Sequence, residues 1–479
     1  MHLKGVLRTL GILIILFGAG MWLPALVSLH YHAGHAVQFL ASGLLVMLVG
    51  SVALHLGGEA PDHLTHKDGF LIVALAWVVL SILGAVPFWL TGTCDSFVDG
   101  LFESTSGLTT TGATVLSNLD KTAPSILFWR SMQEWLGGMG IIVLAVAVMP
   151  LLGVGGMQLF KAETPGPVKD KLTARVTETA KVLWFIYLSM TAFAAFALWL
   201  AGMTPFDAVN HAMCTVAIGG FSTHDASIGY YDSPVIRGLI VLFMLLAGIN
   251  FTLHFAALRR GFSFRVYFQD DEFRTYLKWL AALLVLISLL TLPDGKGTWD
   301  EVIFNTVAVA TTTGYAVSDY TLWAPGTGLL LFAAMFVGAC AGSTGGGMKI
   351  VRVLLLYRQG MREVRRLIHP RGVIQVKIGG KSIGSQVVEA LWGFFVLYML
   401  CFAIIATLVA FSGVDMLTAL SATAACLTNT GPGFGYVGPA DNYAWMPDGA
   451  KAALMFGMVL GRLEIYTFFV LLVPEFWRK

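Results

Sequence analysis

Ten apolar runs, each long enough to cross a lipid bilayer, constrain this chain more than any other feature. A membrane-spanning helix needs about 20 predominantly apolar residues. Only 12% of the 479 residues are charged, whereas a typical soluble domain carries about 25%. We therefore predict an all-α polytopic membrane protein. The runs begin near Leu10, Val37, Phe70, Leu127, Val182, Val235, Tyr276, Gly328, Val388 and Ala452.

Lysine and arginine residues are divided unevenly between the connecting segments. Ten spans place both termini on one side, and 24 of the 30 basic residues fall on that side. Cytoplasmic segments are enriched in Lys and Arg, so we predict that both termini are cytoplasmic. The first apolar run is too long for a signal peptide and is interpreted as a retained span. Acidic residues in the outer segments either attract cations or only solvate the loops. The five cysteines lack the spacing of metal ligands, and we interpret them as small buried hydrophobic residues.

Four outer segments repeat one pattern. Each opens with Ser or Thr followed three residues later by Asp or Glu, which is the capping box that starts a helix. Each then runs through about three turns of small and apolar residues and reaches a glycine, after 16, 16, 16 and 19 residues. The predicted caps are Ser96/Asp99, Thr204/Asp207, Thr298/Glu301 and Ser412/Asp415, and the glycines are Gly112, Gly220, Gly314 and Gly431.

The length of these segments indicates where they end. A helix of about 10–12 residues is about 15–18 Å long, which reaches halfway across the hydrocarbon. Non-helical backbone at that depth survives only when it is buried in protein or lines an aqueous path. We therefore predict four units of span, re-entrant helix, extended return and span. The helix C-termini favour a cation, and the extended residues offer backbone carbonyls in place of its hydration shell.

The four loops "TTTGAT", "IGGFST", "TTTGY" and "TNTGPG", with "CAGSTGGGMKIVR" and "GRLEIYT", make the chain resemble the TrkH/TrkG–KtrB–HKT superfamily of potassium transporters. The resemblance covers nearly the whole chain and is closest to the TrkH/TrkG branch. It implies four span–pore-helix–span repeats in a pseudo-fourfold arrangement around one pore, plus two extra N-terminal spans. The implied units are residues 1–66 for the N-terminal spans, then repeats at 67–178, 179–273, 274–385 and 386–479.

The resemblance also implies a selectivity filter for K⁺ built from the four loops. Glycine at all four central positions goes with potassium preference in this superfamily. Loop 2 departs slightly, because Ile218 and Gly219 stand where Thr-Gly is common. Whether the threonine hydroxyls bind ions or brace the loops stays open. The implied filter residues are Thr110, Thr111, Gly112, Ile218, Gly219, Gly220, Thr312, Thr313, Gly314, Asn429, Thr430 and Gly431.

A glycine cluster interrupts the run that begins near Gly328. Glycine costs about 1 kcal/mol relative to alanine inside a helix, so the cluster predicts a break; a closely packed kink is the alternative. The resemblance implies an intramembrane gate at 340–349, with Gly342, Gly345, Gly346 and Gly347, and with Lys349 as an anchor. Arg462 lies inside another apolar run, where arginine is costly and functional by default. We expect it to bind the free carbonyls of the gate.

The sequence says less about the partners of the protein and about how transport is coupled to energy. The resemblance implies a homodimer in the bacterial inner membrane. It also implies a cytosolic TrkA-type nucleotide-binding ring, for which the basic inner loops would be the docking surface. The chain itself has no nucleotide-binding motif in its required context, so K⁺ is the only expected ligand. Symport with H⁺ or Na⁺ and channel-like flow both remain open. A sodium transporter is the main alternative, and a membrane enzyme is disfavoured because no catalytic dyad recurs; Glu134 is interpreted as the partner of Arg130.

Overall fold

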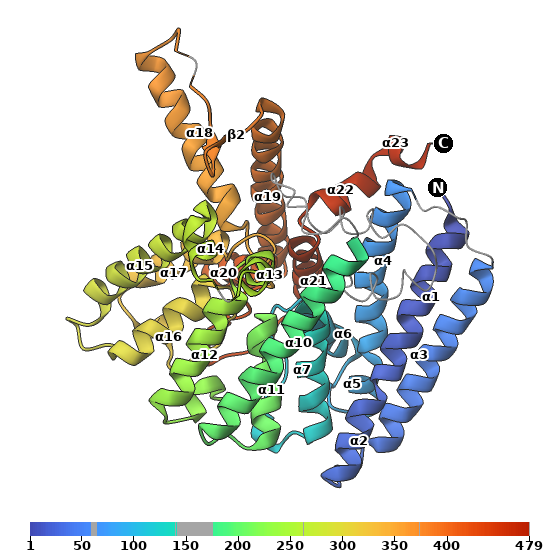
Figure 1. The fold of residues 1–479 in the computed structure, drawn as a ribbon. Helices are drawn as coiled ribbons and strands as arrows, with labels where there is room; N and C mark the ends of the chain where they lie inside the picture. The colour runs from blue at the N-terminus through green and yellow to red at the C-terminus, as the bar shows by residue number, and fades with distance from the viewer. Residues whose placement is uncertain (59–64, 139, 141–175, 262, 373, 479) are drawn as a thin grey trace.

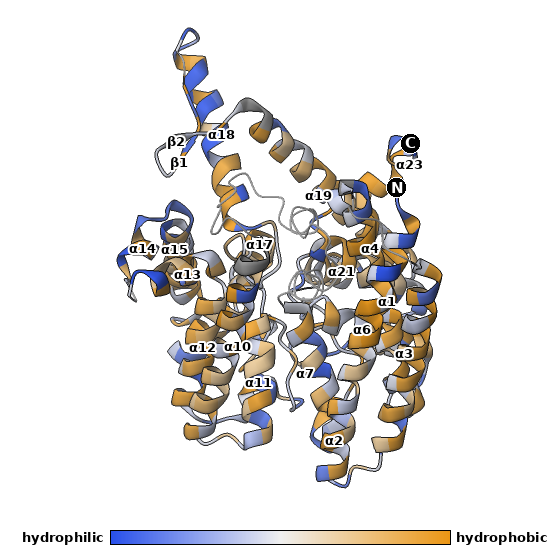
Figure 2. Ribbon diagram, turned by 45° about the vertical axis from the view of Figure 1, so that its right-hand side comes forward, coloured by the Kyte–Doolittle hydropathy of each residue, from blue (hydrophilic) through white to orange (hydrophobic). Residues whose placement is uncertain are grey.

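The computed structural model describes the chain except for residues 59–64, 139, 141–175, 262, 373 and 479. The described part consists of helices and their connections, apart from one hairpin in which β1 (Lys377–Ile378) pairs antiparallel with β2 (Lys381–Ser382). Both termini lie at one end of the helical body (Figure 1). Apolar residues dominate the helices of the body (Figure 2). The predicted helical membrane fold is confirmed, with the hairpin as its one exception in the described residues.

Six stretches of helix are apolar and long enough to cross a membrane without a sharp break. They confirm the spans predicted near Leu10, Val37, Phe70, Val182, Tyr276 and Val388. Two of the six are pairs of consecutive helices. The helices are α1 (Leu3–Gly20) with α2 (Trp22–His30), α3 (Ala36–Gly57), α4 (His66–Gly84) with α5 (Val86–Leu90), α10 (Val176–Leu200), α15 (Asp271–Thr291) and α19 (Ser385–Phe411).

Helices α1 and α3 pack side by side through glycines, at the edge of the body in Figure 1. A Cβ on Gly11 would lie 2.7 Å from the carbonyl oxygen of Gly50, and one on Gly43 would lie 2.7 Å from that of Gly18. Small residues allow helix backbones to approach this closely in membranes. Many of the 53 glycines therefore have a packing role, and only their context separates them from those of the four loops.

The four short helices predicted between spans are all present. They are α6 (Phe97–Leu108), α11 (Pro205–Ala217), α16 (Trp299–Ala310) and α20 (Met416–Leu427), with 12, 13, 12 and 12 residues. The side chains of Ser96, Thr204 and Thr298 accept a hydrogen bond from the backbone N–H three residues on, as their capping role requires. At 1.5 Å per residue these helices are about 18–20 Å long, well short of the roughly 30 Å that a spanning helix covers.

The fourth predicted cap is wrong, because the N-cap lies three residues later, at Asp415 instead of Ser412. Helix α20 begins at Met416, and its N-cap is Asp415, whose carboxylate accepts from Thr418 N–H at 3.1 Å. Ser412 instead donates to the carbonyl of Leu408 at the end of the preceding span. Asp is as good an N-cap as Ser, and the cap that leads to the glycine 16 residues later is the one used. The spacing of 16 is therefore common to all four units.

The second span of units 2, 3 and 4 is interrupted near its middle. α12 (Pro234–Ala247) meets α13 (Phe251–Arg259) at 91°, and α21 (Asp448–Arg462) meets α22 (Tyr466–Leu472) at 110°. α17 (Pro325–Val337) stops 12 residues before α18 (Ile350–Ile368). α7 (Pro124–Gly138) covers the start of the run near Leu127, whose continuation lies outside the described residues. The predicted break after α17 is confirmed, and the breaks after α12 and α21 are additional.

The remaining elements are short connections at the two ends of the body. They are η1 (Leu119–Lys121), η2 (Ser227–Tyr230), η3 (Tyr320–Leu322), α14 (Arg265–Gln269) and α23 (Pro474–Trp477). α18 carries charged residues and extends away from the body, beyond the end where the termini lie (Figures 1 and 2). The five cysteines are buried and free, as predicted.

Candidate ion pathway

Each short helix ends in a loop with the same backbone path. Two residues before each glycine the chain adopts a left-handed conformation, with φ of 52° at Thr110, 55° at Ile218, 66° at Thr312 and 54° at Asn429. The glycines themselves have φ of 78°, 87°, 80° and 97°. Non-glycine residues rarely adopt positive φ. Its occurrence at the equivalent position of all four loops indicates that the loops share one backbone structure. The glycines fit it because they lack a Cβ.

The four loops contact one another in a closed order. A Cβ on Gly112 would overlap the carbonyl oxygen of Gly219 in loop 2, and one on Gly220 would overlap that of Thr313 in loop 3. A Cβ on Gly314 would overlap the carbonyl of Thr430 in loop 4, and one on Gly431 would lie 2.5 Å from that of Thr111 in loop 1. Each glycine therefore lies against the carbonyl before the next glycine, and the fourth loop returns to the first.

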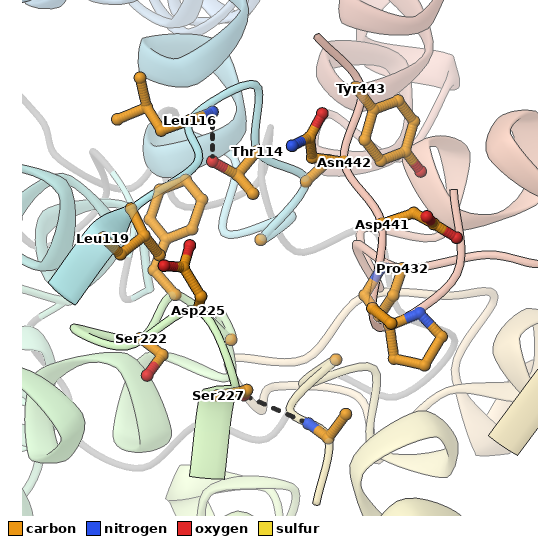
Figure 3. A pocket seen from close by; sticks show the side chains of 18 of the residues that line it. Thr114, Leu116, Leu119, Ser222, Asp225, Ser227, Pro432, Asp441, Asn442 and Tyr443 are labelled. Carbon is orange, nitrogen blue, oxygen red and sulfur yellow. Dashed lines mark hydrogen bonds between the residues drawn. The ribbon is translucent and has the colours of Figure 1, made fainter. Parts of the chain in front are cut away.

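A cavity of 190 Å³ opens on one side of this ring. Its lining comes from all four loops and includes Gly112, Gly220, Gly314 and Pro432 (Figure 3). Asp225 and Asp441 also line it. Four other acidic residues of the predicted outer segments have close basic partners: Glu103 pairs with Arg130, Asp99 with Lys451, Asp300 with Arg237 and Asp120 with His224. Asp225, which lines the cavity, was not foreseen from the sequence.

Most threonine hydroxyls of the loops are engaged in the protein. Three equivalent pairs are linked at 2.7 Å: Thr109 with Thr111, Thr311 with Thr313, and Thr428 with Thr430. The first member of each pair also donates to a carbonyl of its own helix, at 2.7–2.8 Å. These hydroxyls brace the loops. Among the described residues, the buried hydroxyl of Thr110 has no hydrogen-bond partner.

Polar residues on the short helices hold the chain just beyond three of the glycines. The backbone N–H three residues after the glycine donates to Glu103 at 2.9 Å in loop 1, to Asn305 at 3.1 Å in loop 3 and to Ser421 at 3.0 Å in loop 4. In loop 2, His211 contacts the Ser222 hydroxyl at 3.0 Å. Sequence reasoning missed these residues, because their chemical types differ. Their recurrence about seven residues after the cap was the available signal.

The loop-2 environment corrects one sequence interpretation. Arg130 does not pair with Glu134. Its guanidinium donates to Glu103 at 2.6 Å and to the carbonyl of Ser222 at 3.0 Å. It therefore ties the first short helix to loop 2. The carboxylate of Glu134 accepts from Phe221 N–H at 3.1 and 3.2 Å.

The segment 338–349, between α17 and α18, lies against the ends of three short helices. The Thr344 hydroxyl donates to the Val216 carbonyl at 2.9 Å. Gly346 N–H donates to the Thr312 hydroxyl at 2.7 Å, and Gly347 N–H donates to the Thr428 carbonyl at 2.9 Å. A Cβ on Gly346 would overlap that same Thr428 carbonyl, so glycine is required by close approach. Gly342 and Gly347 have φ of 72° and 70°, and Gly345 sits beneath Thr311.

Two basic side chains hold this segment. Lys349 donates to the carbonyl of Gly345. Arg462, at the end of α21, donates to the carbonyl of Thr344 at 3.0 Å and to that of Gly138 at 2.9 Å. The expected contact between Arg462 and carbonyls of the segment is therefore present. Glu464, two residues further on, pairs with Arg352 of α18.

His224 lines the cavity and joins the loops of the first two units. Its Nδ1 lies 2.5 Å from Asp120 of η1, its Nε2 lies 3.7 Å from Asp207, and its ring stacks on Tyr230. Partial burial opposes protonation, but the carboxylates of Asp207 and Asp120 outweigh it and raise the pKa of His224. The hydrogen bond from His224 in turn lowers the pKa of Asp120.

We expect the raised pKa of His224 to make stability depend on pH. A group with a higher pKa in the folded state contributes stability that is complete below its unfolded pKa, about 6.5, and is lost as pH rises through the folded pKa. The melting temperature of the purified protein should therefore fall as the pH rises above about 6.5, and less steeply in His224→Gln. His30→Gln, at the end of α2, is the control. Equal slopes in wild type and His224→Gln would contradict this role.

Comparison with known proteins identifies the group. The sequence model of TrkH, described as a cation transport protein, matches residues 35–479. The chain belongs to the TrkH family. It is 46% identical to the Trk system potassium uptake protein TrkH of Vibrio parahaemolyticus and 36% identical to TrkG of Escherichia coli K12. These matches cover 100% of this chain and 100% and 99% of the relatives.

The structural comparison agrees. The crystal structure of the potassium transporter TrkH from Vibrio parahaemolyticus superposes with a TM-score of 0.91, at 44% identity and with both chains fully covered. The chain is therefore a multi-pass membrane protein of a cation transport family and not an enzyme. Within the described residues, no group of three His, Cys, Asp or Glu side chains is placed to hold a metal ion.

Proposed function

We propose that this chain takes up K⁺ across the bacterial inner membrane through a filter made by its four glycine loops. The observation that carries the proposal is the closed order of contacts, in which each loop glycine lies against a carbonyl of the next loop. The relatives at 46% and 36% identity are named potassium uptake proteins. The four units are proposed to surround one pore with pseudo-fourfold symmetry, with the domain boundaries given above.

The proposed filter works through backbone oxygen. Its residues are those predicted from the sequence, and the carbonyls of Thr111, Gly219, Thr313 and Thr430 lie next to the glycines of neighbouring loops. Carbonyl rings replace the hydration shell of a potassium ion. The C-terminal ends of the four short helices add partial negative charge there. No charged side chain is needed, which explains why the loops carry none.

We propose that segment 338–349 and Arg462 form the gate beneath this filter. The segment contacts three of the four short-helix ends through Val216, Thr312 and Thr428. Arg462 places a positive charge beside it and links it to the end of α7. A closed gate of this kind blocks cations both by the backbone and by the charge. Opening requires the segment to leave its present hydrogen bonds.

Regulation is proposed to come from a cytosolic TrkA-type ring acting on a homodimer. The basic α18, which extends from the body (Figure 2), carries Arg358, Arg362, Arg365 and Arg366. Its exposed apolar residues include Tyr357, Leu367 and Ile368. Such a helix offers both charge and apolar area to another protein surface. The basic inner segments and both termini are proposed to be cytoplasmic.

Uptake of rubidium tracer into liposomes tests the proposal. Purified protein in liposomes should take up Rb⁺, external K⁺ should compete strongly, and external Na⁺ should compete weakly. The physical reason is that a carbonyl ring replaces the hydration shell of K⁺ and Rb⁺ but not equally that of Na⁺. Empty liposomes are the control. Flux without preference for Rb⁺ over Na⁺ would contradict the potassium filter and favour a sodium or unselective transporter.

A further inference from the structure

The second spans of the four units have one equivalent buried position, which is occupied by methionine in three units and by glutamate in the first. Counted from the first residue of α7, α12, α17 and α21, the eleventh residue is Glu134, Met244, Met335 and Met458. All four are fully buried. A methionine fills space adaptably in an apolar environment. A carboxylate at the same place needs hydrogen-bond partners, so Glu134 has a role that the methionines lack.

The loop beside Glu134 is also the exceptional one. Loops 1, 3 and 4 carry a threonine directly before the filter glycine, braced by a second threonine two residues earlier. Loop 2 has Ala217 and Gly219 at these positions and therefore lacks this hydroxyl pair. The carboxylate of Glu134 fills the vacated place, because a Cβ on Gly219 would overlap it.

The backbone does not explain Gly219. Its φ lies outside the left-handed range, unlike that of Gly220 at 87°, so the conformation would accept a side chain. The three atoms nearest to a Cβ at this position all belong to the carboxylate group of Glu134. The two departures thus compensate each other: a methionine is replaced by glutamate in α7, and a threonine is replaced by glycine in loop 2.

We propose that Glu134 is a positioning residue that sets the selectivity of the filter by holding loop 2. The inference rests on the proposed function. Both carboxylate oxygens accept from Phe221 N–H, directly after Gly220, at 3.1 and 3.2 Å. This bond fixes the backbone of loop 2. The carbonyl of Gly219 in that loop therefore keeps its position against Gly112 of loop 1. Glu134 thereby replaces the threonine pair of the other three loops.

Replacing each of the two residues by its counterpart from the other units tests this compensation. Glu134→Met alone leaves Phe221 N–H without its acceptor and a gap at Gly219. We expect the preference for Rb⁺ over Na⁺ to fall about tenfold, the size of effect that a buried donor left without its acceptor produces. Gly219→Thr alone overlaps the carboxylate and should lose selectivity or fold poorly. The double variant restores two residues of the pattern in the other units, the methionine and the threonine before the filter glycine, and should recover part of the preference. Met244→Leu, at the equivalent position of α12, is the matched control.

Glu134→Gln separates positioning from charge. Its amide oxygen can still accept from Phe221 N–H, so it should keep selectivity within about threefold of wild type. Tracer uptake and elution as a monodisperse peak are measured for every variant. Wild-type selectivity in Glu134→Met, no recovery in the double variant, or a loss in Glu134→Gln as large as in Glu134→Met would each overturn the inference. A wild-type protein without Rb⁺ preference would instead contradict the proposed function.

Discussion

Replacing Gly314 by alanine should lower the preference for K⁺ over Na⁺ at least tenfold. A Cβ at this position would overlap the carbonyl oxygen of Thr430 and lie 2.8 Å from Cδ of Pro432. The residue also has φ of 80°, where a side chain costs about 1–2 kcal/mol. Either the Thr430 carbonyl turns away or the loops separate, and both change the oxygen ring. About 1.4 kcal/mol corresponds to a factor of ten, so the backbone cost alone reaches this size.

Gly238→Ala is the matched control for this prediction. Gly238 lies inside α12, has no positive φ, and a Cβ there would meet nothing within 4 Å. Its replacement should leave uptake and selectivity at wild-type values and slightly favour the helix. Competition of rubidium tracer uptake by K⁺ and Na⁺ measures both variants. A Gly314→Ala protein with the wild-type ratio would show that this loop is not part of the filter.

Neutralising Arg462 should raise the ion flux of the protein in the absence of any partner by about tenfold. In Arg462→Gln the charge-assisted bonds to the carbonyls of Thr344 and Gly138 are weakened or lost. Hydrogen bonds to charged groups are worth about 1.5–3 kcal/mol. The segment 338–349 would then leave its closed position more often, and the positive charge that opposes cations would also be absent.

Two further variants define this effect. Arg462→Lys keeps the charge but lacks the planar fork that reaches two carbonyls, so its flux should lie between those of wild type and Arg462→Gln. Arg366→Gln, in the last turn of α18 and half exposed, should behave as wild type when the protein is tested alone. Single-channel or flux measurements in liposomes report the change. Unchanged flux in Arg462→Gln would remove this residue from the gate.

Sequence reasoning predicted the short helices and their glycines because both depend on local patterns. Capping residues, apolar runs of three turns and a glycine at fixed spacing recur four times. Its error at Ser412 arose because "SGVD" contains two residue types that cap helices equally well. Only the backbone conformation distinguishes them, and Asp415 has the extended one. The constant spacing of 16 residues was a clue to the right choice.

Contacts between the units could not be predicted from the sequence. Arg130 and Glu134 are four residues apart on α7, a spacing that favours an ion pair on an isolated helix. In the folded chain Glu103 and Phe221 compete for them, and these partners are 27 and 87 residues away. The breaks after α12 and α21 were missed because neither site carries a glycine cluster like that of segment 338–349. Packing against neighbouring units decides them.

The reversal potential with K⁺ on one side of a lipid bilayer and Na⁺ on the other tests the central claim most directly. A filter of four carbonyl loops should hold the purified protein's reversal potential near the K⁺ equilibrium potential, and Gly314→Ala should move it toward zero. A wild-type reversal potential near zero would contradict the assignment of these loops as a potassium filter.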